Sequence, residues 1–159
     1  MSGIKKITVA REGGFLIAQI YQIAGRIFEK KLKNLDLVDI TPSQGRILFA
    51  LWKEDDISIQ ELSQRTSLGK STLTAMLDKL EESGHIRRVP SRRDRRKIHV
   101  CLTEKDKMLQ GTYNTVSEKM TQLTYKSLTP GEIDMFETFL QRILNNLKTY
   151  EKGGKLNEG

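Results

Sequence analysis

Residues 58–103 decide the fold and read SIQELSQRTSLGKSTLTAMLDKLEESGHIRRVPSRRDRRKIHVCLT. The first half contains two helical patterns, separated by a turn at Ser67 to Gly69, because apolar side chains recur there at steps of three and four. The second half contains two short extended runs with an arginine-rich loop between them, which is the pattern of a β-hairpin. A helix-turn-helix over 57–80 followed by a basic hairpin over 85–103 is the order of a winged helix-turn-helix.

The sequence on both sides of this stretch is helical. Residues 41–44 (TPSQ), 58–61 (SIQE) and 129–132 (TPGE) have the pattern of capping boxes, and the first and last have a proline at the first helical position. Apolar residues recur at helical spacing along 14–34 and along 104–150. We therefore expect a mainly α protein with a single domain over 14–150 and a wing of two to three strands.

The positive charge of the chain is concentrated in the hairpin. The whole sequence has 27 Lys and Arg against 20 Asp and Glu, a net charge of +7, and residues 87–97 contain seven of the bases and one acid. The rest of the chain is close to neutral. A basic run alone is more often a solvated face, but a basic hairpin directly after a helix-turn-helix indicates a nucleic-acid interface.

Two groups of side chains are candidates for DNA contact. The second helix of the helix-turn-helix would enter the major groove by its first turn, and the hairpin tip would lie over a minor groove. Asp94 is the one acid at the tip, and we expect it to hydrogen-bond loop amides or to pair with Arg93 or Arg96. The candidate DNA-binding residues are Lys70, Ser71, Thr72, Thr74, Arg92, Arg93, Asp94, Arg95, Arg96 and Lys97.

Several classes of protein are disfavoured. The single cysteine, Cys101, excludes an intramolecular disulfide framework, and with only two histidines an all-protein metal site is improbable. We assign no role to His85, His99 or Cys101. The sequence has no glycine-rich phosphate loop and no nucleophile–base arrangement, so we expect no enzyme activity and no cofactor. No apolar run approaches the roughly 18 residues of a membrane span, and we expect a soluble, cytoplasmic protein.

The stretch from Ile57 to Thr103 resembles the winged helix-turn-helix of the MarR (multiple antibiotic resistance regulator) family. The most specific matches are KST at 70–72, LDKLEESG ending at Gly84, DRR at 94–96 and LTEK at 102–105. The order of helices matches over nearly the whole chain. One departure is Gly69, which occupies the place of the N-cap serine common in the family, so a phosphate contact from that serine cannot be transferred.

The resemblance implies a homodimer that binds double-stranded DNA. In this family the first helix and the last two helices interlock, here 14–34 and 104–150, and two winged domains face a pseudopalindromic operator, usually as a repressor. The apolar seams over 16–27, 109–123 and 133–147 independently offer more apolar surface than one small winged domain can cover.

The resemblance also implies a small aromatic effector bound between the dimer helices and the winged domain. Tyr21, Arg26, Trp52 and Tyr113 are candidates for such a pocket, although each of these residue types more often belongs to packing or solvated surface. The peroxide-sensing branch of the family uses a cysteine in the first helix, which this chain lacks. We therefore expect a ligand-responsive repressor, and the alternative is a winged-helix module that binds protein or RNA.

Overall fold

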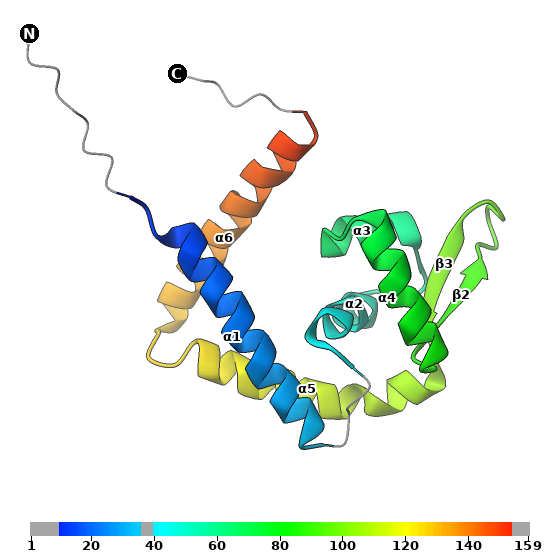
Figure 1. Cartoon of the computed structure of the whole chain (residues 1–159), viewed down its shortest axis with the longest axis horizontal. Helices are drawn as coiled ribbons and strands as arrows, with labels where there is room; N and C mark the ends of the chain where they lie inside the picture. Colours follow the sequence, from blue (N-terminus) through cyan, green and yellow to red (C-terminus); the bar gives the residue numbers. More distant parts are fainter. Residues whose placement is uncertain (1–9, 36–39, 154–159) are drawn as a thin grey trace, which may run out of the picture. The chain divides into compact units, whose positions relative to one another are not determined.

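The computed structural model describes residues 10–35 and 40–153, and its elements are mainly helical (Figure 1). The elements are α1 (Gly13–Lys33), α2 (Pro42–Lys53), β1 (Ile57–Ser58), α3 (Ile59–Thr66), α4 (Lys70–Glu82), β2 (Ile86–Pro90), β3 (Ile98–Leu102), α5 (Glu104–Thr124) and α6 (Pro130–Glu151). The mainly α fold with a small wing is confirmed. The chain divides into two compact units, Met1–Glu118 and Lys119–Gly159, so the single domain over 14–150 stays a prediction.

Side-chain caps fix where several helices begin. The hydroxyl of Thr41 accepts a hydrogen bond from the Gln44 amide (3.2 Å), while the Gln44 side chain accepts one from the Thr41 amide (3.1 Å). Thr129 and Glu132 form the same reciprocal pair at the start of α6. The capping boxes expected at Thr41 and Thr129 are therefore present, and each satisfies two N–H groups that a helix start leaves without intrahelical acceptors. At the third, the Ser58 hydroxyl accepts from the Glu61 amide at 3.1 Å, while the Glu61 side chain pairs with Arg65.

The helix-turn-helix is closed by local hydrogen bonds. The last residue of the turn into α4 is Gly69, and α3 ends where Ser67 adopts a left-handed conformation with φ of 57°. The Ser63 hydroxyl donates to the Leu68 carbonyl oxygen at 2.7 Å, which holds the turn against α3. The short connection therefore has a defined conformation rather than a loose one.

The wing is part of a three-stranded antiparallel sheet with the strand order β1-β3-β2. Ile57 of β1 lies opposite Val100, and Ile86 of β2 lies opposite Leu102. These side chains are buried. The sheet thus reaches the upper end of the expected two to three strands, and its third strand is only two residues long.

The core of the first unit lies between the helices and this sheet. Leu73, Leu77 and Leu80 of α4 are completely buried. Helix α1 packs on α2 at Gly45, where an added Cβ would lie 3.2 Å from the Phe28 ring. A larger residue at position 45 would therefore require the Phe28 ring to shift by a few tenths of an ångström.

The second unit consists of the end of α5 and helix α6. Tyr125 packs edge-on against Phe136 with ring centroids 6.2 Å apart, and its hydroxyl donates to Glu137 at 2.7 Å. No residue of α6, all of which the structure describes, is buried. In the described part of the chain no helix is both long and apolar enough to span a membrane.

Candidate nucleic-acid interface

The first turn of α4 presents polar side chains on its outer face. Lys70, Ser71, Thr72 and Thr74 are all exposed, and the Thr74 hydroxyl donates to the Lys70 carbonyl oxygen at 2.8 Å. The opposite face is the buried leucine stripe described above. The helix is therefore anchored by one face and open along the other, as expected for an element that enters a groove.

The start of α4 differs from the starts of α2, α3 and α6. Those three helices begin at a Thr or Ser whose hydroxyl accepts an amide hydrogen bond. The N-cap of α4 is Gly69. Glycine has no side chain that could accept a hydrogen bond from the first N–H groups of the helix. These N–H groups and the positive end of the helix dipole are thus available to an anion such as a phosphate.

The arginine loop of the wing is closed by its own backbone. The Ser91 amide donates to the Lys97 carbonyl oxygen at 2.8 Å, and the Lys97 amide donates to that of Asp94 at 2.9 Å. Ser91 is buried, and its hydroxyl oxygen accepts from the amides of Arg93 (3.3 Å) and Asp94 (3.5 Å). The charged side chains therefore project from a tight turn instead of a loose loop.

Asp94 organises one side of this turn. Its Oδ1 accepts hydrogen bonds from the backbone amide and the Nε of Arg96, both at 3.1 Å. The bonds from Arg96, followed by the charge of Lys97, lower the pKa of the Asp94 carboxyl. The expected pairing of Asp94 with Arg96 is confirmed, and direct contact of Asp94 with DNA remains a prediction.

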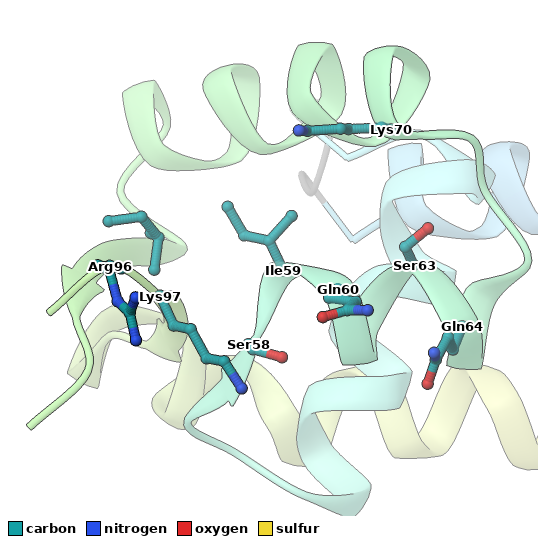
Figure 2. Close-up of a pocket in the computed structure, with 9 residues that line it drawn as sticks. Ser58, Ile59, Gln60, Ser63, Gln64, Lys70, Arg96 and Lys97 are labelled. Atoms are coloured by element: carbon teal, nitrogen blue, oxygen red, sulfur yellow. The ribbon is translucent and has the colours of Figure 1, made fainter. Parts of the chain in front are cut away.

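A surface cavity of about 560 Å³ lies where α3, α4 and the wing meet. Figure 2 shows Lys70 of α4 above this cavity, Arg96 and Lys97 of the wing to one side, and residues of α3 below. The lining residues are Ser58, Ile59, Gln60, Ser63, Gln64, Lys70, Arg96, Lys97 and Ile98. One concave surface is thus bordered by three of the candidate cations. Lys70 comes from α4, and Arg96 and Lys97 come from the wing, 26 or more residues later.

The α3 residues of this cavity are not among the DNA-binding candidates predicted from the sequence. Gln60 and Gln64 are spaced by four, so they lie on the same side of a helix, and Ser63 lines the cavity beside them. That spacing was a readable signal. The other candidates, Ser71, Thr72, Thr74, Arg92, Arg93, Asp94 and Arg95, do not line the cavity, although all of them lie on α4 or the wing loop.

Arg88 has a different role from the arginines of the loop. Its guanidinium lies 2.6 Å from Asp78 and 3.1 Å from Glu81, and its backbone amide donates to Glu81 at 2.8 Å. The hydrogen bonds from Arg88 lower the pKa of Glu81, and both acids raise the pKa of Arg88. Arg88 therefore fastens β2 to α4, and its charge is largely compensated within the protein.

Cys101 and the two histidines do not form a common site. Hydrogen bonds join Asp56, which precedes β1, to His99 (2.9 Å) and to Cys101 (3.4 Å) of the central strand β3. Burial, and after it the hydrogen bond to Asp56, raises the pKa of Cys101 to about 11. The thiol is therefore protonated and unreactive at neutral pH. His85 is fully buried elsewhere, against Asp106. Within the described residues no group of three such side chains is arranged to hold a metal ion.

The four effector candidates have distinct surroundings. Tyr21 is half exposed, and Arg46 of α2 stacks over its ring at 4.4 Å and donates to its hydroxyl at 2.8 Å. Arg26 is exposed. Trp52 donates from Nε1 to Asp106 at 2.8 Å, and its ring packs on the buried Tyr113 with centroids 5.0 Å apart. Tyr113 is therefore part of the packed interior, and Trp52 is partly buried against it.

Comparison with known proteins agrees with this geometry. The model of the MarR family matches residues 40–98. The structure is similar to that of a MarR mutant from E. coli in complex with operator DNA, with a TM-score of 0.72 and 30% sequence identity, covering 82% of this chain and 92% of that one. The chain belongs to the MarR family. Members of this family regulate transcription and are not enzymes, which agrees with the expected absence of catalysis.

Two curated relatives of this MarR-family chain are also transcriptional regulators of the helix-turn-helix type. TtmR from Methylorubrum extorquens (strain PA1) is 34% identical over 104 residues, which are 65% of this chain and 52% of TtmR. SarZ from Staphylococcus aureus (strain USA300) is 26% identical over 143 residues, which are 87% of this chain and 90% of SarZ. The chain thus spans about half the length of the first relative and most of the second.

Proposed function

We propose that this protein is a sequence-specific, double-stranded DNA-binding transcriptional regulator. The observation that carries the proposal is the cavity that Lys70 of α4 shares with Arg96 and Lys97 of the wing. A groove-reading helix and a basic hairpin that border one concave surface can contact adjacent parts of a duplex at the same time.

The two elements have separate tasks in this proposal. The exposed side chains of the first α4 turn read base edges in the major groove, because hydroxyl and amine groups reach donors and acceptors there. The wing arginines lie along the minor groove and neutralise phosphates, which contributes affinity without sequence information. Asp94 holds Arg96 in place, so its own contribution is to the shape of the wing.

We further propose that the protein acts as a homodimer at a pseudopalindromic operator. Phe15 and Ile20 of α1 are 67% and 56% exposed, and Phe139 and Leu147 of α6 are 48% and 64% exposed. Apolar faces of this extent on an isolated chain favour association with a second copy. Two-fold symmetry would place the two recognition helices about 34 Å apart, one turn of B-DNA.

We propose repression released by a small aromatic anion as the mode of regulation. Support comes from the family resemblance and from the exposed Tyr21, whose contact with Arg46 places a cation and an aromatic ring together on α1 and α2. A panel of phenolic and aromatic carboxylates tested for release of bound duplex would identify the effector class. Retention of the duplex with every compound at millimolar concentration would contradict this mode.

Selection of bound sequences from a random duplex library tests the proposed function. The expected result is an inverted repeat whose half-sites are about one helical turn apart. Affinity for the selected duplex should fall steeply with salt, by a slope of about −0.9 per neutralised phosphate on a log-log plot. A protein- or RNA-binding module would enrich no duplex sequence, and a salt-independent affinity would contradict the phosphate contacts.

A further inference from the structure

A buried carboxylate joins three elements of the first unit. Asp106, in the first turn of α5, is completely buried. Its Oδ2 accepts a hydrogen bond from Trp52 Nε1 of α2 at 2.8 Å, and its Oδ1 lies 3.0 Å from Nδ1 of His85. His85 directly precedes β2 and is also completely buried. One side chain therefore contacts α2, the segment after α4, and its own helix α5.

A buried cluster of Asp106, His85 and Trp52 is unusual in a small hydrophobic core. Burying a carboxylate is unfavourable unless hydrogen bonds compensate for its lost hydration. Three apolar side chains of similar volume would fill the same space without that requirement. The directional bonds to Trp52 and His85 instead fix how the three elements are oriented, because a polar cluster of this kind is satisfied in one arrangement only.

His85 is held rigidly at the end of α4. Its backbone amide donates to the Leu80 carbonyl oxygen at 2.9 Å, after Gly84 has turned the chain with φ of +80°. Thr103 donates from its hydroxyl to the Gly84 carbonyl oxygen at 2.5 Å and from its amide to that of His85 at 3.1 Å. The C-terminal end of α4 is thus fastened to the start of α5 by backbone and side-chain bonds together.

Because α4 is long, a small change of angle at its attached end displaces the other end by a larger distance. Lys70 stands at one end of the helix, and the attachment lies beyond the other end, 13 residues or about 20 Å away. A tilt of about 10° at the attached end would move the first turn by about 3 Å. That displacement equals the length of a hydrogen bond, so base contacts would be lost while the longer-range attraction to phosphates would persist.

We propose that Asp106 is a positioning residue for DNA recognition: through His85 and Trp52 it sets the direction in which α4 enters the groove. The inference rests on the proposed function. Asp106 itself touches no DNA, because its side chain is completely buried. It acts on the discrimination between sequences and leaves the wing's attraction for phosphates unchanged.

The test compares Asp106→Asn with Glu104→Gln in the full-length protein. Glu104 lies in the same first turn of α5, and its carboxylate is 89% exposed, so the control removes the same charge without touching the cluster. Affinities are measured for the duplex selected from a random library and for a scrambled duplex of equal length and composition. We expect the ratio of the two affinities to fall about tenfold in Asp106→Asn and to stay unchanged in Glu104→Gln. The salt slope on the scrambled duplex should be the same in both variants.

A second variant guards against misfolding. Trp52→Phe removes the indole N–H while keeping an aromatic ring beside Tyr113, and it should lower the ratio in the same direction by a smaller factor. Trp52 is the only tryptophan in the chain, so the emission maximum of Asp106→Asn should also shift relative to the wild type, whereas that of Glu104→Gln should not.

Two results would overturn the inference. The first is an unchanged ratio in both cluster variants. The second is an equal loss of affinity for both duplexes, which indicates a purely structural role. If Asp106→Asn does not unfold cooperatively, Trp52→Phe decides between these outcomes. Failure of the proposed function would look different from failure of this inference. The wild type itself would then enrich no duplex sequence, while the emission shift in Asp106→Asn would persist.

Discussion

Helices α4 and α6 have similar patterns of apolar residues and very different surroundings. In α4 the leucines at 73, 77 and 80 are completely buried by the rest of their unit. In α6 the corresponding stripe has no buried residue, and its members Phe139, Ile143 and Leu147 are 44 to 64% exposed. Apolar periodicity therefore predicts that a helix has a face to bury, but it does not say which chain covers that face.

The largest loss of stability should come from truncating a buried side chain on the covered face of α4. Leu77→Ala deletes a completely buried side chain, and we expect a loss of about 3 kcal/mol in the free energy of unfolding from lost transfer energy and an unfilled cavity. Urea denaturation measures this loss, with Thr74→Ala on the exposed side of the same helix as the control. A loss below about 1 kcal/mol for Leu77→Ala would mean that the core can collapse around the site.

The next largest effect should come from charging the uncovered face. Ile143→Asp places a carboxylate in the apolar stripe of α6, which should convert a dimer to a monomer and lower affinity for the selected duplex by at least tenfold. Light scattering after size-exclusion chromatography gives the mass, and Asn145→Asp adds the same charge at an exposed position about 200° round the helix from Ile143. An unaltered mass for Ile143→Asp would show that another surface mediates association.

The two kinds of arginine near α4 allow a sharper test of the winged unit. Arg95→Ala removes an exposed charge of the wing loop and should make the salt slope shallower by about 0.9, the value for one phosphate contact. Arg88→Ala removes a charge already paired with Asp78 and Glu81 and should leave the slope unchanged. Equal changes in both variants would show that Arg88 also reaches the DNA.

The smallest effect concerns how the two helices begin. Helix α6 has a capping box at Thr129, and Thr129→Ala should cost about 1 kcal/mol. Helix α4 begins at Gly69, where an added Cβ meets no atom within 4 Å. Gly69→Ser should therefore stabilise the protein by a few tenths of a kcal/mol, as measured by thermal unfolding. A destabilised Gly69→Ser variant would show that the glycine is needed for its backbone conformation.

Local signals were sufficient to predict most of the fold. The capping boxes at Thr41 and Thr129, the end of α4 near Gly84 and the pairing of Asp94 with Arg96 each depend on residues within four positions of one another. Short-range patterns of this kind are readable because the chain itself fixes the distances involved.

The features that could not be located in the sequence depend on contacts across the fold. Strand β1 has two residues, too few for any periodicity, and it exists because β3 pairs with it more than 40 positions later. The sequence places Arg88 in a basic run, but only the packing of β2 on α4 brings it to Glu81. The burial of His85 against Asp106 likewise joins residues 21 positions apart. No local pattern carries this information.

The closed turn of the wing also has a consequence for proteolysis. Trypsin cleaves after arginine and lysine, and residues 92–97 of the hairpin tip are five such residues and one aspartate. Cleavage there requires the protease to open a turn that the Ser91 and Lys97 backbones hold shut. A duplex lying over the tip would slow cleavage at this position, while cleavage at the exposed Lys152, which follows α6, provides an internal reference for the digestion. The rate of tryptic cleavage in the hairpin, followed on a gel, thus measures whether DNA covers the hairpin.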